Sequence, residues 1–137
     1  MFISITRLRL RHWWYLPAFF LGSNRSITQA RKAPGFRKGM TLADRKRAFW
    51  TLTGWESEAA MKAYRSSGPH KTVMGKLPGW CDEAAVAHYQ ADELPPWTEA
   101  WERLKAGRFL SVQRPSADQL AKQISAPRTQ PLMQRSI

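Results

Sequence analysis

Three histidines and one cysteine are the side chains of this 137-residue chain that are best suited to acid–base, nucleophilic or metal chemistry. His12, His70 and His88 lie too far apart in the sequence to form a local metal-ligand motif, so we expect no metal site. The single Cys81 excludes a disulfide framework, and we predict that it is a small buried residue. No glycine-rich phosphate loop or Gly-x-Ser-x-Gly motif supports a kinase, a hydrolase or a nucleotide-dependent oxidoreductase.

Histidine is the natural general base near neutral pH, which makes His70 and His88 the candidate catalytic residues. His88 is expected in the middle of a strand beside Tyr89. His70 follows Gly68-Pro69 at the start of a short helix, where the helix dipole disfavours protonation. Each has a structural alternative: His88 as a hydrogen-bonded strand residue, and His70 as a surface or capping residue.

Aromatic residues make up 12% of the chain, and several are candidates for lining a small-molecule cavity. The candidate substrate-binding residues are Trp50, Trp55, Tyr64, Phe19 and Tyr89. Large aromatics dominate the core of a small domain, so core packing is the alternative for the first three of these residues.

The spacing of apolar residues predicts an alternating order of strands and helices. Strands are predicted over 2–10, 36–42, 48–55, 83–90 and 108–112. Helices are predicted to start near Pro17, after a Ser57 cap, at His70 and after Pro95-Pro96, with a further short helix over 118–124. This order predicts an α+β fold with helices on one face of a mainly antiparallel sheet. We place one domain over 1–116 and a basic, loose tail over 117–137.

The predicted strands are apolar on both sides, which bears on oligomeric state. Trp50 and Leu52 lie on one side of the strand over 48–55, and Phe49 and Trp55 lie on the other. One side can meet the helices, and the sheet of a second copy is the economical cover for the other side. We therefore expect a homodimer.

The net charge of +12 is concentrated at the N-terminus. Residues 1–43 contain eight basic residues and no acidic residue, whereas residues 44–112 are almost balanced. A solvated strand face and a basic tail explain this pattern without nucleic acid, which we do not expect as a partner. Binding to nucleic acid or to an anionic surface through the first 43 residues is the alternative.

The apolar run from Trp13 to Leu21 imitates part of a signal peptide, but it is too short to span a bilayer and no cleavage site follows it. We expect no transmembrane segment and a cytoplasmic protein. A contact between this run and a membrane surface stays open.

The stretch FWTLTGWESEAAMKAYRSSGPHK over 49–71 and the ARKAPGFRKG and DEAAVAHY segments resemble the dimeric α/β-barrel superfamily. This superfamily includes antibiotic-biosynthesis monooxygenases, heme-degrading monooxygenases and spheroidene monooxygenase. The most similar branch is an uncharacterised bacterial family near spheroidene monooxygenase. The resemblance implies a ferredoxin-like protomer, with two protomers forming a dimeric α/β barrel.

The pattern of the heme-degrading branch fails at three positions. Where that pattern requires asparagine, tryptophan and histidine, this sequence has Thr6, Tyr64 and Met74, although His70 lies near the third position. The resemblance therefore implies a monooxygenase-like protein that acts on a hydrophobic small molecule and needs no cofactor, with heme as the alternative cofactor. The competing hypothesis is a non-catalytic binder of heme or another apolar ligand.

Overall fold

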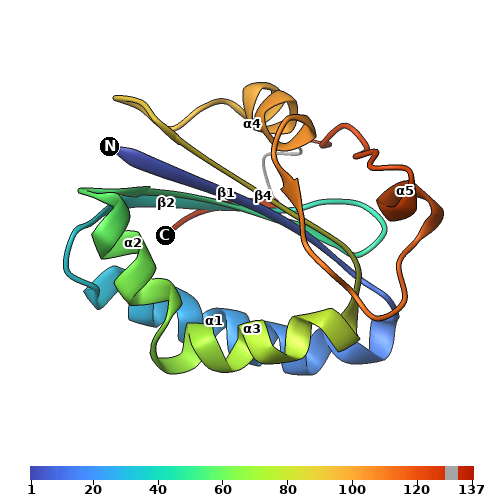
Figure 1. Ribbon diagram of the computed structural model, residues 1–137. Coiled ribbons are helices and arrows are strands. Elements are labelled where there is room, and N and C mark those ends of the chain that lie inside the picture. Colours follow the sequence, from blue (N-terminus) through green and yellow to red (C-terminus); the bar gives the residue numbers. More distant parts are fainter. Residues whose placement is uncertain (129–132) are drawn as a thin grey trace.

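The protein forms one open antiparallel sheet that does not close into a barrel within the chain (Figure 1). The computed structural model describes residues 1–128 and 133–137. The six strands lie in the order β5-β4-β1-β3-β2-β6. In chain order the elements are β1 (Phe2–Leu10), the 3-10 helix η1 (Trp13–Tyr15), α1 (Leu16–Lys32), β2 (Phe36–Ala43), β3 (Ala48–Trp55), α2 (Glu58–Arg65), α3 (Gly68–Trp80), β4 (Cys81–Gln90), α4 (Trp97–Lys105), β5 (Arg108–Phe109), α5 (Ala117–Leu120) and β6 (Gln134–Ser136).

The helices α1, α2 and α3 lie together on one face of the sheet (Figure 1). Two apolar clusters fix them there. The first, here called the aromatic cluster, contains the buried residues Phe2, Ala30, Trp55 and Met61, with Phe36 and Tyr64 packed against it. The second contains Leu10, Phe19, Leu77 and Cys81. The predicted α+β fold with helices packed on one face of an antiparallel sheet is thus confirmed for α1–α3.

The opposite face of the sheet is covered by later parts of the same chain. Trp97, Ala100 and Leu104 of α4 pack on Ile3, Ile5, Trp50 and Leu52, and the cluster also includes Ile124. Figure 1 shows α4 and α5 on this side of the sheet. The apolar residues that suggested a partner's sheet are therefore buried within the protomer, and they no longer argue for a homodimer.

Several element boundaries differ from those predicted. The predicted helix at 70–77 extends over Gly68–Trp80, because Pro69 suits the first turn and Leu77 is buried against the sheet. The predicted strand at 108–112 is reduced to Arg108–Phe109. Within the predicted loose tail, Gln119 and Ile124 are buried, and β6 pairs with β2 from Met40 to Leu42.

Candidate functional site

His70 lies at the start of α3 and donates two hydrogen bonds that fix its position. Its main-chain N–H donates to Oε1 of Gln29 at 2.9 Å, and its Nδ1 lies 3.1 Å from the carbonyl oxygen of Arg65. A carbonyl oxygen can only accept, so Nδ1 carries the proton and Nε2 carries the free lone pair. The structure thus determines the tautomer that a general base requires.

Burial lowers the pKa of His70, and the positive charge of Arg65 lowers it further, although the hydrogen bond to the Arg65 carbonyl acts in the opposite direction. The imidazole is therefore neutral at neutral pH. A neutral ring whose Nε2 is free can accept a proton from a bound molecule.

Gln29 of α1 connects this region to the turn between α2 and α3. Its Nε2 donates to the carbonyl oxygens of Tyr64 and Ser67 at 3.1 and 2.9 Å, while Oε1 accepts from His70. Gly68 has a φ of 58°, and a Cβ at this position would lie 3.2 Å from Cδ of Gln29. Only glycine fits this turn without strain. Nothing in the sequence distinguishes Gln29 from other polar residues on α1, so sequence analysis missed it.

Three rings form a continuous row across this face of the sheet. The ring centroids of Trp55 and Tyr64 are 4.9 Å apart, and those of Tyr64 and His70 are 4.6 Å apart. The Tyr64 hydroxyl donates to the carbonyl oxygen of Ser26 at 3.1 Å. Burial raises the pKa of Tyr64, so its hydroxyl stays protonated. The structure therefore brings together three predicted site residues, Trp55, Tyr64 and His70.

Two buried polar atoms beside Tyr64 have no hydrogen-bond partner among the described residues. They are Nε1 of Trp55 and Oγ of Ser26. Trp55 is fully buried and Ser26 is 7% exposed. Buried polar groups are normally paired, so an unpaired indole N–H and hydroxyl beside the same tyrosine are unusual. The cavities of about 660 and 370 Å³ are lined by other residues. Sequence analysis missed Ser26 because it reads as an ordinary polar position of a helix.

A row of polar side chains crosses the sheet on the same face. Ser4 of β1 lies opposite Thr53 of β3 and opposite His88 of β4, and Thr6 lies opposite Thr51. Directly paired residues project from the same face of a sheet, so His88 faces the same side as Trp55. The alternation of Ser4 and Thr6 in the first strand is a signal that could have indicated this row from the sequence.

His88 lies at the open edge of the sheet, in a cavity of about 660 Å³. The lining also includes the predicted residue Tyr89 and the basic residues Lys62, Arg65, Arg103 and Arg108. Burial lowers the pKa of His88, and the positive charges of Arg65 and Arg108 add to this effect. The cavity is therefore electropositive and suits an anionic group of a ligand.

Arg65 connects this cavity to His70. Its side chain lines the cavity, while its carbonyl oxygen accepts from His70. The ring of His88 also lies 5.4 Å from that of Phe2, which belongs to the aromatic cluster. The two candidate histidines thus both lie on the helix-covered side of the sheet, and each approaches one ring of this cluster: His88 approaches Phe2, and His70 approaches Tyr64.

The remaining predicted site residues lie elsewhere. Trp50 projects from the opposite face, where its Nε1 donates to Asp44 at 3.0 Å and its ring packs edge-on against Trp97. Phe19 belongs to the second apolar cluster and packs on Phe49 at 4.7 Å. Cys81 is buried, and burial raises the pKa of its thiol to about 12, so it is no thiolate nucleophile at neutral pH.

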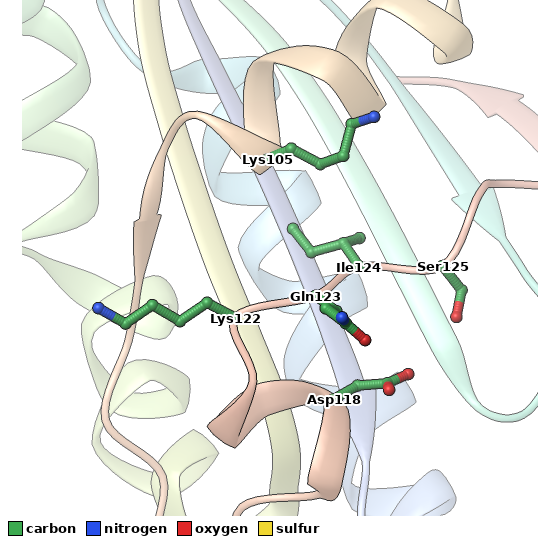
Figure 2. Close-up of a pocket in the computed structure, with 6 residues that line it drawn as sticks. All are labelled: Lys105, Asp118, Lys122, Gln123, Ile124 and Ser125. Carbon is green, nitrogen blue, oxygen red and sulfur yellow. The ribbon is translucent and has the colours of Figure 1, made fainter.

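A second cavity, of about 370 Å³, lies between α4 and the segment that follows α5. Figure 2 shows Lys105, Asp118 and Lys122 at its edge. The side chains of Asp118 and Lys122 point in opposite directions, so the charged groups do not converge on one point. Within residues 1–128 and 133–137 no group of three or more His, Cys, Asp or Glu side chains could hold a metal ion. This cavity is therefore not the candidate site.

No family model and no curated protein matches the chain. Solved structures do match. An antibiotic biosynthesis monooxygenase superposes with a TM-score of 0.60 and 12% identity, over 68% of this chain and 100% of that chain. Rv0793 from Mycobacterium tuberculosis gives a TM-score of 0.58 and 16% identity, over 67% and 95% of the two chains. SnoaB from Streptomyces nogalater is a cofactor-independent oxygenase solved as the N63A mutant. It superposes with a TM-score of 0.57 and 13% identity, over 69% of this chain and 96% of that chain.

These likenesses confirm the resemblance at the level of the fold. The chain has the fold of the antibiotic-biosynthesis-monooxygenase-like proteins, whereas a relation to spheroidene monooxygenase stays a prediction. At such low identity, these likenesses show the fold alone and do not establish an activity, which depends on the site.

Proposed function

We propose that this protein is a cofactor-independent, monooxygenase-like enzyme that acts on a hydrophobic small molecule bound beside Trp55, Tyr64 and His70. The observation that carries the proposal is the neutral imidazole of His70, whose Nδ1 is bonded to the Arg65 carbonyl and whose ring ends a row of aromatic rings. The cofactor-independent oxygenase with the same fold supports the choice of reaction class.

The substrate we propose is an aromatic ketone or phenol with an acidic C–H or O–H bond. Because Trp55 is fully buried and packed on Tyr64 in the free protein, we propose that the substrate rings displace the Tyr64 ring from Trp55. The substrate oxygen then accepts from the unpaired Nε1 of Trp55. Nε2 of His70 removes the acidic proton. The aromatic surroundings and the indole N–H stabilise the resulting anion.

The anion then supplies the electrons for the reaction with dioxygen. For a methylene group, one electron passes from the carbanion to O₂, and the substrate radical and superoxide combine to form a C–O bond. The peroxide takes up the proton from His70. Loss of water breaks the O–O bond and leaves a ketone. One methylene and one O₂ give one carbonyl and one H₂O, so no external reductant is needed.

The test is oxygen uptake with anthrone, a tricyclic ketone with an acidic methylene group, by protein treated with a chelator. We expect anthraquinone formation that is faster than the uncatalysed reaction and is reduced at least about 100-fold in His70→Ala. Lys71→Ala, an exposed neighbour on α3, is the matched control and should keep full activity. Equal rates in His70→Ala and the parent protein would refute the role of His70.

The competing hypothesis is a non-catalytic binder of heme or another apolar ligand. Nε2 of His70 and the ring of His88 are the two histidine groups on the helix-covered face that could ligate heme iron. A hemin titration separates the two hypotheses. A saturable Soret band that weakens in His70→Ala or His88→Ala, without anthrone turnover, would favour the binder.

Homodimer formation is also proposed, from the resemblance to the dimeric α/β-barrel superfamily. Light scattering of the purified protein tests it directly. A mass near the 15.8 kDa of one chain at all concentrations would reject it.

A further inference from the structure

Four large apolar side chains are exposed within nine residues at the start of the first helix. Trp13 is 58% exposed, Trp14 67%, Phe20 47% and Leu21 54%. The other exposed large apolar residues in the described part of the chain, Leu120 and Met133, are isolated in sequence from this group. Isolated exposed apolar residues are common on proteins, but a contiguous group with two tryptophans is typical of a contact surface.

The structure presents these side chains in defined positions. The guanidinium of Arg47 lies 5.5 Å from the ring centroid of Trp13. The ring of Trp14 stacks on His12 with centroids 3.5 Å apart and an interplanar angle of 25°. Phe20 packs edge-on against Phe49 at 5.7 Å. We name the group formed by Trp13, Trp14, Phe20 and Leu21 the aromatic patch.

Basic residues flank the aromatic patch. The turn between β2 and β3 contains Arg45, Lys46 and Arg47 in succession. Two hydrogen bonds attach this turn to the end of β1: Leu10 N–H donates to the Arg47 carbonyl at 3.0 Å, and Nε of Arg47 donates to the Leu10 carbonyl at 3.0 Å. Arg47 therefore lies next to Trp13, and the exposed residues Arg45 and Lys46 precede it in the same turn.

The helix α1 continues this charge distribution. Arg25 is exposed and follows Leu21 by four residues, so the two share one side of the helix. No acidic residue occurs before Asp44, and Asp44 already accepts hydrogen bonds from Trp50 Nε1 and from the main-chain N–H of Arg45. The aromatic patch thus has cations beside it on the turn between β2 and β3 and on α1.

We propose that the aromatic patch docks this protein onto the surface of an anionic lipid bilayer. Tryptophan side chains favour the interface between lipid headgroups and acyl chains, and the flanking cations pair with lipid phosphates. The contact is peripheral, since no described helix is long and apolar enough to cross a membrane. Its residues lie outside the His70 site, so the proposal does not depend on the proposed function.

The charge and the apolar side chains of this surface favour an anionic bilayer over a second copy of the chain and over nucleic acid. A second copy docked face to face by two-fold symmetry would place Arg45, Lys46 and Arg47 opposite or near their own copies, with no acidic residue of the patch to offset the repulsion. Nucleic acid would account for the cations, but not for exposed Leu21 beside Phe20.

The test uses the full chain and vesicles of phosphatidylcholine, with and without phosphatidylglycerol. We expect co-sedimentation with the phosphatidylglycerol vesicles and a blue shift of tryptophan fluorescence, which lipids brominated on the acyl chains should quench. The double variant Trp13→Ala/Trp14→Ala should weaken binding about tenfold or more and remove most of the quenching. Arg45→Gln/Lys46→Gln should weaken binding severalfold, and added salt should have the same effect.

Two controls match these variants elsewhere on the surface. Leu120→Ala removes an apolar side chain that is 72% exposed, and Arg114→Gln removes an exposed cation; both should bind as the parent protein does. Circular dichroism checks that each variant is folded. Unchanged vesicle binding in folded Trp13→Ala/Trp14→Ala would overturn the proposal, as would equal binding to vesicles without phosphatidylglycerol. Self-association that this variant abolishes, without vesicle binding, would overturn it in favour of a second copy.

Discussion

The main-chain carbonyl of Arg65 accepts a hydrogen bond from Nδ1 of His70 at a distance of 3.1 Å. Arg65 is the last residue of α2, where carbonyl groups have no partner within the helix. The end of one helix therefore receives the imidazole at the start of the next, and this contact determines which ring nitrogen is free. The same residue extends its side chain into the cavity that contains His88.

The lowered pKa of His70 predicts a pH-dependent stability. Burial lowers this pKa below its ordinary value of 6.5, so the unfolded chain takes up the proton first. The free energy of unfolding should be independent of His70 above 6.5 and should decrease as the pH falls below that value, until His70 is protonated in the folded state. Urea denaturation at several pH values should show a smaller decrease in His70→Gln. An identical decrease in both proteins would contradict the buried, neutral state.

The hydrogen bond from Tyr64 to Ser26 predicts a modest effect on stability. Tyr64→Phe keeps the ring that packs on Trp55 but removes the hydroxyl donor at 3.1 Å from the Ser26 carbonyl. We expect a loss of about 0.5–1.5 kcal/mol in the free energy of unfolding, measured by urea denaturation. A loss above about 3 kcal/mol would mean that the hydroxyl does more than make this bond.

The unpaired indole N–H of Trp55 predicts a spectroscopic signature of ligand binding. In nitrogen–proton NMR spectra, the indole resonance of Trp55 should move on addition of anthrone, because the ligand oxygen becomes its acceptor. The resonances of Trp13 and Trp14, which lie outside the site, should not move. A shift confined to these two exposed residues would place binding outside the site.

Arg7 and Glu83 form a buried ion pair at 2.7 Å, with side chains that are 6% and 3% exposed. Burial alone would raise the pKa of Glu83, but hydrogen bonds from Arg7 and Ser116 and the charges of Arg7 and Arg9 lower it overall. Glu83→Gln should cost about 3–5 kcal/mol, because it leaves the Arg7 charge buried without its counterion.

The double replacement Arg7→Met/Glu83→Leu should cost much less, since it removes both buried charges. A thermodynamic double-mutant cycle with Arg7→Met and Glu83→Leu as its single variants measures the interaction energy, and additive losses would reject the coupling. The lowered pKa also predicts a loss of stability as the pH falls below 4.5, the ordinary value for glutamate.

The local signals of the sequence predicted most of the elements. Ser57 was predicted to cap a helix, and its hydroxyl accepts from the main-chain N–H of Ala60 at 3.1 Å. Strand boundaries were best where alternation is strong, as in β3 over Ala48–Trp55. The predicted boundaries were poorest for the strand β5 and the helix α3. The limits of β5 depend on its pairing with β4, and those of α3 depend on the burial of Leu77.

The sequence alone determined the alternation of strands and helices, the acid-free N-terminus and the two histidines available for chemistry. Only the tertiary structure decided that Tyr64 packs between Trp55 and His70 while Trp50 lies on the other face, because strand register and helix packing join residues distant in sequence. The tertiary structure also decided that the sheet face with Trp50 and Leu52 is covered by the same chain. Ile124, far along the chain, covers that face because burying apolar area there lowers the free energy of the folded protein.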